Sequence, residues 1–166
     1  RTVIRSGRAR RSNRRYQWVG MHQTDVAVGA SAVVLNAVPA VNDITNARNA
    51  TLMAMHVCFA VRNPDTLTNR YLAMNIQKTE YDGLGSATGV VTPYSTSAFD
   101  LANGDILDWC YLPTPDDNSA VQVVQHKVKA RRKLQRGNHG IVIALQTSGA
   151  PDLRVGVLSR ALLAYG

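Results

Sequence analysis

The amino-acid sequence predicts an all-β protein, in which an eight-stranded jelly-roll β-sandwich follows a disordered basic N-terminal arm. Strand patterns recur along the chain after the arm, and turn clusters rich in Pro, Asn, Asp and Gly separate them. At 166 residues, 45% of them hydrophobic, the chain is long enough to bury one core. Eight strands with long crossovers in so short a chain favour the jelly roll. An immunoglobulin-like sandwich is the alternative, although its Cys…Trp…Cys framework is absent.

The arm comprises residues 1–17, and the jelly-roll domain comprises residues 18–166. Seven arginines fall within the first fifteen positions, and no acidic residue precedes Asp25. A segment with this charge density and so few apolar groups cannot bury enough surface to fold alone. We therefore expect the arm to be mobile until it binds a partner.

The strands of the domain are predicted from runs of alternating or continuously apolar residues. Residues 51–61 place apolar side chains on both faces, which suits a central strand of a packed sheet. Residues 71–80 alternate more clearly between apolar and polar positions. The connection 81–104 is polar and Gly-rich, and loops of such length in compact domains are usually functional or at interfaces. The eight predicted strands are residues 22–29, 31–38, 51–61, 71–80, 105–112, 120–129, 140–148 and 153–165.

The basic residues are concentrated in two segments, and the chain between them is mildly acidic. The first segment is the arm, and the second is residues 127–136, which carry six basic residues and no acidic one. Between them, residues 18–126 carry four basic and ten acidic residues. Such segregation predicts a polyanionic partner more strongly than evenly spread charges would.

Both basic segments carry the chemistry of nucleic-acid binding. Arginine is permanently charged and presents a planar fork of donors that matches a phosphate, and neutralising several phosphates releases condensed counterions. Tyr16 and Trp18 offer flat rings on which unpaired bases could stack, or they anchor the arm to the sandwich. The segment 127–136 either faces the same polyanion or forms an exposed turn. The predicted nucleic-acid-binding residues are Arg1, Arg5, Arg8, Arg10, Arg11, Arg14, Arg15, Tyr16, Trp18, Lys127, Lys129, Arg131, Arg132, Lys133 and Arg136.

The sequence predicts no constellation for catalysis, for a cofactor or for a metal. The segment GLGSATG (83–89) is Gly-rich but lacks the Lys-Ser/Thr pair of a phosphate-binding loop. The four histidines lie in different predicted elements without the spacing of a metal site. Cys58 and Cys110 lie in apolar stretches and are predicted to be buried thiols. No apolar run approaches the roughly 18 residues of a membrane span, so we expect no membrane partner. Because no catalytic or cofactor-binding constellation is indicated, we expect no small-molecule substrate either.

Three stretches of the chain carry a resemblance to a known family. They are RARRSNRRYQW (8–18), TLMAMHVCFAVRNPDT (51–66), and the closing pair HKVKARRKLQRGNHGIVIALQTS (126–148) and LRVGVLSRALLAY (153–165). In composition and order they resemble the small capsid proteins of circular, Rep-encoding single-stranded DNA (CRESS-DNA) viruses, which have a single jelly roll.

The resemblance implies a viral coat protein without enzymatic activity or cofactor. It implies that sixty copies self-assemble into an icosahedral shell, with the arms turned inward onto a packaged single-stranded DNA. The protein would then be found in the virion, and in the host nucleus during assembly. Residues 39–49 and 81–104, at the two ends of the sandwich, would be the candidates for contacts between subunits.

Other functions fit the same pattern of charge. A coat protein of a small satellite RNA virus would carry a similar arm, because phosphate contacts distinguish neither sugar nor sequence, so DNA is favoured over RNA only by the resemblance. A cellular nucleic-acid-binding β-domain with a basic tail would also fit, although no aromatic RNA-recognition motif is present. An enzyme or lectin-like binder on this fold would need a polar site that the sequence does not indicate.

Overall fold

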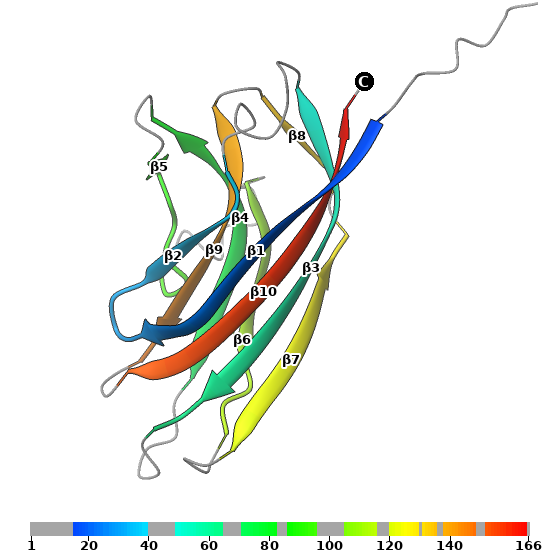
Figure 1. Cartoon of the computed structure of the whole chain (residues 1–166). Coiled ribbons are helices and arrows are strands. Elements are labelled where there is room, and N and C mark those ends of the chain that lie inside the picture. The colour runs from blue at the N-terminus through cyan, green and yellow to red at the C-terminus, as the bar shows by residue number, and fades with distance from the viewer. Residues whose placement is uncertain are drawn as a thin grey trace, which may run out of the picture.

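Two antiparallel β-sheets stack face to face in the computed structural model of the chain (Figure 1). The structure describes residues 15–39, 49–64, 71–82, 86–95, 105–115, 120–129, 131–135, 138–148 and 152–165. The strands are β1 (Arg15–Val28), β2 (Val33–Val38), β3 (Ala50–Arg62), β4 (Leu72–Tyr81), β5 (Ala87–Thr88), β6 (Ile106–Leu112), β7 (Val121–Val128), β8 (Arg132–Leu134), β9 (His139–Thr147) and β10 (Leu153–Tyr165).

The strand order is that of a jelly roll, as the sequence predicts. Sheet A has the order β1-β10-β3-β7, with the short β8 also paired to β3, and sheet B has the order β2-β9-β4-β5, with β6 also paired to β4. The first and last strands, β1 and β10, are therefore neighbours in one sheet, and β2 and β9 are neighbours in the other. All eight predicted strands are present, and β5 and β8 are short additions.

The first strand begins earlier than the sequence predicts. We expected a strand over residues 22–29, whereas β1 begins at Arg15 and pairs with β10 from Arg15↔Tyr165 to Val28↔Leu153. Residues 15–17, assigned to the arm, are thus part of the sandwich in this structure. The thirteen-residue β10 provides a partner along this whole length, and a partner of that length outweighs the weak strand pattern at the junction. Residues 1–14 of the arm lie outside the described residues.

A bulge interrupts β1 and reverses its alternation near the end of the strand. The register with β10 shifts between Gln23 and Val26, and Asp25 has a positive φ of 59°. Acidic and amide residues are the side chains that accept this left-handed conformation most readily after glycine. Thr24 and Val26, which simple alternation along residues 22–29 would place on one face, therefore differ: Thr24 is exposed, whereas Val26 packs against the core.

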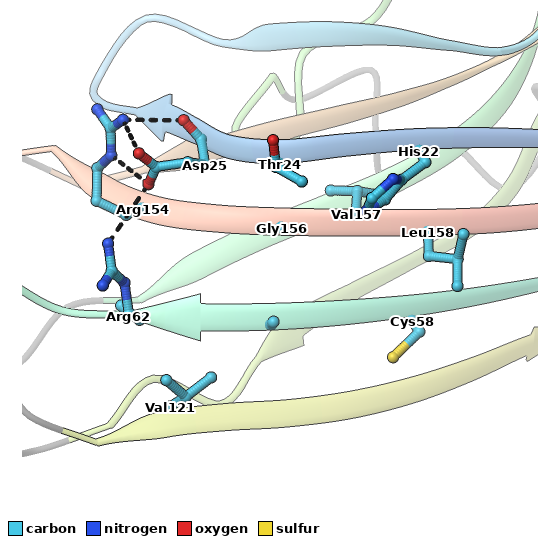
Figure 2. Close-up of a pocket in the computed structure, with 11 residues that line it drawn as sticks. His22, Thr24, Asp25, Cys58, Arg62, Val121, Arg154, Gly156, Val157 and Leu158 are labelled. Carbon is cyan, nitrogen blue, oxygen red and sulfur yellow. Dashed lines mark hydrogen bonds and ion pairs between the residues drawn. The ribbon is translucent and has the colours of Figure 1, made fainter.

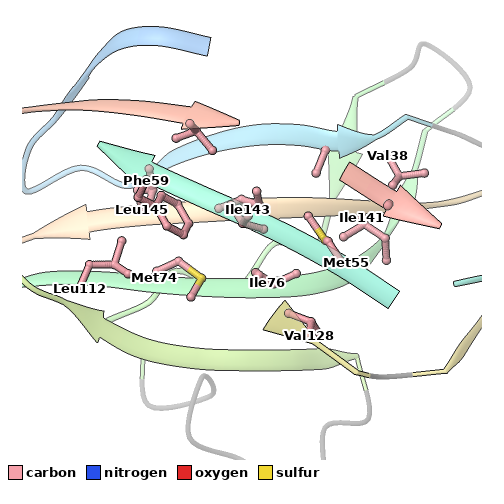
Figure 3. Packing of buried hydrophobic residues seen from close by; sticks show 14 of the residues in the cluster. Val38, Met55, Phe59, Met74, Ile76, Leu112, Val128, Ile141, Ile143 and Leu145 are labelled. Atoms are coloured by element: carbon pink, nitrogen blue, oxygen red, sulfur yellow. The ribbon is translucent and has the colours of Figure 1, made fainter. Parts of the chain in front are cut away.

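The core lies between the two sheets and is built from alternate residues of the long strands (Figure 3). From β3 it takes Met55, Val57, Phe59 and Val61, of which Phe59 is fully buried. The opposing sheet contributes further fully buried side chains, which are Met74, Ile76, Ile141, Ile143 and Leu145. The central position predicted for residues 51–61 is confirmed, because β3 lies between β10 and β7.

Polar side chains on the outer face of β4 hold part of the long connection onto sheet B. Asn75 and Gln77 are buried and donate hydrogen bonds to the Val91 carbonyl at 2.8 Å each, while Gln77 accepts one from the Val91 amide at 2.9 Å. Thr79 donates to the Thr88 carbonyl at 2.6 Å. The described residues 86–95 are therefore fixed to their own sheet, and the predicted role of 81–104 between subunits stays a prediction.

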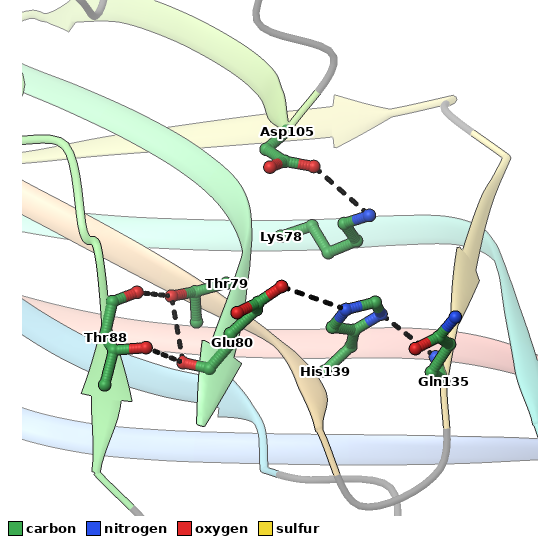
Figure 4. A network of polar contacts seen from close by, with 7 residues as sticks. All are labelled: Lys78, Thr79, Glu80, Thr88, Asp105, Gln135 and His139. Atoms are coloured by element: carbon green, nitrogen blue, oxygen red, sulfur yellow. Dashed lines mark hydrogen bonds and ion pairs between the residues drawn. The ribbon is translucent and has the colours of Figure 1, made fainter. Parts of the chain in front are cut away.

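A second polar network lies around Lys78 and Glu80 of β4 and His139 of β9 (Figure 4). Lys78 forms an ion pair with Asp105 at 3.2 Å, and His139 lies 3.8 Å from Glu80. The backbone amide of Gln135 donates to His139 Nδ1 at 3.1 Å. This network ties the turn that follows β8 to β4, and so positions the second basic segment against the sandwich.

Replacing Phe59 by Ala should destabilise the fold strongly. The side chain is fully buried in the centre of the core, and Phe→Ala substitutions at such sites cost about 3–5 kcal/mol. Urea unfolding followed by tryptophan fluorescence would measure the loss, at a concentration that keeps the chain unassembled. The control is Leu158→Ala on the outer face of sheet A, where 49% of the residue is exposed and the expected loss is about 0.5 kcal/mol. Equal losses at both positions would contradict the assignment of this core.

Candidate nucleic-acid interface

The outer face of sheet A brings the described end of the arm next to the second basic segment. Cross-strand register places Tyr16 of β1 opposite Ala164, Ala164 opposite Thr51, and Thr51 opposite Lys133 of β8. The start of β1 and the second basic segment thus lie at the same end of the sheet, which Figure 1 also shows. Because residues directly opposite in an antiparallel pair share a face, Tyr16 and Lys133 point to the same side.

The next cationic row runs across the four main strands of the sheet. Gly20 is opposite Arg160, Arg160 is opposite His56, and His56 is opposite Lys127. Arg160, His56 and Lys127 are all exposed.

Trp18 lies beside this row and contacts two of its members. The Arg160 guanidinium carbon is 4.8 Å from the centroid of the Trp18 ring, a cation–π distance, and the His56 ring meets Trp18 edge-on at 6.1 Å between centroids. Trp18 is nevertheless 47% exposed, and Tyr16 is 58% exposed. The alternatives of stacking and anchoring are therefore both represented: Trp18 is fixed to the sheet, and part of its ring still faces solvent.

A polar hollow lies where the second basic segment meets the sheet. Its volume is about 470 Å³, and its lining includes Asn49, Thr51, Arg131, Lys133 and Tyr165. Arg131 and Lys133 line this hollow and are exposed to solvent, so a phosphate group in the hollow could contact both cations.

At the opposite end of the same face, two arginines share one carboxylate (Figure 2). Arg154 donates to the Asp25 carboxylate from Nε at 2.8 Å and from Nη2 at 2.6 Å, and Arg62 lies 3.5 Å from the same carboxylate. The hydrogen bond from Arg154, with the charges of both arginines, lowers the pKa of Asp25 despite some desolvation. These two arginines are thus held to an acid, in contrast to Arg160 and Lys127.

Charge is separated across the sandwich in the described part of the chain. Apart from Lys78, the described cations lie in sheet A or directly beside its strands. Four of the six described acids, Glu80, Asp82, Asp105 and Asp108, lie in or next to strands of sheet B, whereas Asp25 and Asp152 lie in or next to strands of sheet A. The sandwich therefore has one basic outer face and one mildly acidic side.

The structure brings most of the described candidates to one face, with two exceptions. Tyr16, Trp18, Lys127, Arg131 and Lys133 lie on or around the outer face of sheet A, and Lys129 is exposed directly after β7. Arg15 begins β1 at the same end, but it alternates with Tyr16 and lies opposite Tyr165, so it points to the other side of the sheet. Arg132 alternates with Lys133 and is half-buried on the side of Leu134, so it does not join this face. Arg1, Arg5, Arg8, Arg10, Arg11, Arg14 and Arg136 lie outside the described residues.

The predicted turn at residues 131–133 is wrong in part, because Arg132–Leu134 form β8 and pair with β3. The buried side chain of Leu134, which inserts into the core, explains why the segment returns to the sheet. Sequence reasoning missed Arg160 and His56. The signal that could have found Arg160 is the alternation of the last strand: its neighbours Ser159 and Ala161 are buried, so Arg160 points outward.

Within the described ranges, no group of three or more His, Cys, Asp or Glu side chains could hold a metal ion. Over the same residues, no helix is long and apolar enough to cross a membrane. Cys58 and Cys110 are free thiols and half-buried, and burial raises the pKa of Cys110 to about 11.

Comparison with known proteins finds no matching family model and no matching curated protein. Among solved structures, a chain from the structure of infectious bursal disease virus Gx strain has a TM-score of 0.37 and 9% identity, over 92% of this chain and 36% of that one. A chain from the Gt strain has a TM-score of 0.40 and 10% identity, over the same shares of 92% and 36%. This chain therefore spans about a third of the length of those chains.

Replacing Asp25 by Asn should destabilise the protein at neutral pH and have less effect in acid. Asn tolerates the left-handed backbone but cannot form the ion pairs. Because the pKa of Asp25 is lowered in the folded state, its contribution is present above the unfolded pKa and is lost as the pH falls through the folded pKa. Thermal unfolding between pH 7 and pH 3 would measure this convergence of parent and variant. A difference that did not change with pH would point to the shape of the bulge and not to charge.

Proposed function

We propose that this chain is a coat protein that self-assembles into a closed shell and holds single-stranded nucleic acid against the outer face of sheet A. The supporting observation is a set of exposed cations on the outer face of sheet A, next to the end of β1 from which the arm extends. Lys127, Lys133 and Arg160 are exposed there, and Trp18 lies among them.

The basic arm extends this surface. Residues 1–14 join β1 at Arg15, at the end of sheet A where Tyr16 and Lys133 share a row. A phosphate chain bound by the arm would thus begin next to the cations of the sheet. Binding of this kind is driven by counterion release, so its affinity falls steeply with salt.

The mildly acidic side of the sandwich would face away from the nucleic acid. A chain with cations on both sides would repel its own copies in a closely packed shell, and a polyanion could bind either side. With cations on one side only, the phosphates bind that side, and each subunit has a defined orientation in the shell.

The finer parts of the proposal rest on the resemblance of the sequence. On that basis the cargo is single-stranded DNA, the shell is icosahedral with sixty copies, and assembly takes place in the host nucleus. Contacts between copies need not be individually strong, because closed symmetry multiplies them.

The decisive experiment is to express the full chain and a chain lacking residues 1–14, and to compare the purified products. The full chain should form closed particles in negative-stain images and should protect nucleic acid from added nuclease. The shortened chain should keep its circular dichroism spectrum, since β1 remains intact, and should retain little nucleic acid.

The matched control replaces the six arginines of residues 1–14 by lysine. It keeps the charge, so it should retain most of the cargo. A chain that stays monomeric across pH, salt and added nucleic acid would refute the shell. Cargo that RNase digests and DNase leaves intact would favour the satellite RNA alternative.

Trp18→Ala should weaken binding of single-stranded oligonucleotides by about 1–3 kcal/mol and affect duplexes of equal length much less, because paired bases cannot stack on an exposed ring. Fluorescence anisotropy with labelled oligothymidine and its duplex would measure both affinities. Trp109→Phe is the control, since Trp109 lies in sheet B and donates to the Pro93 carbonyl at 2.8 Å. Equal losses on single strand and duplex would show that Trp18 only positions Arg160.

A further inference from the structure

The edge strand β7 has an unpaired side. Over the described residues β7 pairs with β3 alone, through eight successive positions from Val121↔Arg62 to Val128↔Met55. On its inner side the strand is tied to sheet B, because His126 Nε2 contacts the Asp108 carboxylate of β6. Its outer row of backbone donors and acceptors is available for a further strand.

The other edges of the two sheets carry features that discourage pairing, whereas residues 121–126 of β7 do not. β1 is bulged at Asp25, and β2 is bulged between Asn36 and Val38. β5 has two residues, and β6 carries Asp108. In β7 the run Val-Gln-Val-Val-Gln-His (121–126) contains no Lys, Arg, Asp, Glu or Pro, and the first charge of the strand is Lys127 at its end. Charges, prolines and bulges are the devices by which proteins protect an edge, so this stretch of the edge is unprotected.

Apolar surface adjoins this edge on the outer face of sheet A. Val121 and Val123 are 52% and 57% exposed, and Leu158 is 49% exposed. Next to them lies a trough of about 380 Å³ whose lining includes Cys58, Ala60 and Gly156 (Figure 2). Apolar side chains therefore flank the unpaired backbone, as they do where a strand is covered by another strand.

The charges that flank β7 in sequence select the occupant. Asp116 and Asp117 precede the strand in the chain, although they lie outside the described residues, and Lys127 and Lys129 end it. If two copies of β7 ran antiparallel, the acidic end of each would approach the basic end of the other. A parallel arrangement would bring like charges together.

We propose that β7 pairs with β7 of a second copy of this chain, antiparallel and about a two-fold axis centred near Val123 and Val124. The two copies of sheet A then form one continuous sheet, and their basic outer faces lie on the same side. This inference rests on the proposed self-assembly and names the contact with which it begins.

Symmetry restricts the pairing in a way that can be tested. A two-fold axis perpendicular to the sheet keeps both outer faces on one side and places each residue opposite a residue of the same face. If the axis passes through Val123 or Gln125, that residue lies opposite its own copy. If the axis passes through Val124, residue 123 of each copy lies opposite residue 125 of the other. Directly opposite side chains in an antiparallel pair have Cβ atoms close enough for a disulfide.

The test is the double variant Val123→Cys/Gln125→Cys in the full chain, mixed with copper phenanthroline and run on a non-reducing gel. Both it and its controls carry Cys58→Ser, because Cys58 lies opposite residue 125 and would otherwise form a disulfide with it inside the chain. We expect most of the chain to migrate as a disulfide-linked dimer. The Cys58→Ser chain, which keeps Cys110, controls for the remaining native thiol. The matched control is His22→Cys/Thr24→Cys, two exposed positions of the same spacing on β1, at the opposite edge of sheet A, and it should stay monomeric.

A second variant tests the contact without a cross-link. Val123→Lys places a charge at the centre of the pair, so it should abolish dimers in light scattering, whereas Val123→Thr should preserve them. Val123 is exposed, and an unchanged circular dichroism spectrum would show that each variant folds.

The outcomes separate this contact from the proposed shell. Dimers cross-linked through β7 without particles would support the contact and refute the shell. Particles that assemble normally from Val123→Lys, with no cross-link in the double variant, would overturn the contact and leave the shell standing. Equal cross-linking of the β7 and β1 variants would also overturn the contact, because it would show that the disulfides form by random collision.

Discussion

The pairing of the first strand with the last is the interaction on which the rest of the molecule depends. β10 lies between β1 and β3 and hydrogen-bonds to both along its whole length. Without it, β1 would have no partner in sheet A, and Trp18 would not meet Arg160. A contact between residues so far apart in the chain is made only when the sandwich is complete, so the aromatic and cationic surface is a property of the folded domain.

Alternation along the strands converts this pairing into two faces of different character. In β10 the buried residues Val157, Ser159 and Ala161 alternate with exposed Leu158 and Arg160. The inner face fills the core, and the outer face is left to carry charge at one end and apolar surface at the other. The ion pairs of Asp25 with Arg62 and Arg154 occur at the apolar end, so they do not compete with the cations next to Trp18.

Much of the site could be predicted because its residues cluster in the sequence. The basic segment 127–136, Tyr16 and Trp18 are recognisable from composition alone, and their chemistry suits phosphates and bases. Arg160 and His56 could not be found in this way, since neither belongs to a cluster of basic residues in the sequence. Only the register Gly20↔Arg160↔His56↔Lys127 makes them neighbours.

The sequence by itself determined the class of fold, the number of long strands and the presence of concentrated positive charge, because alternation and composition are local properties. Tertiary structure alone decided where β1 begins, that Arg132–Leu134 return to the sheet as β8, and that Arg132 turns away from Lys133. The physical reason is that strand partners are chosen by burial and hydrogen bonding summed over the whole sandwich. A shift of one residue in register moves a side chain from one face to the other.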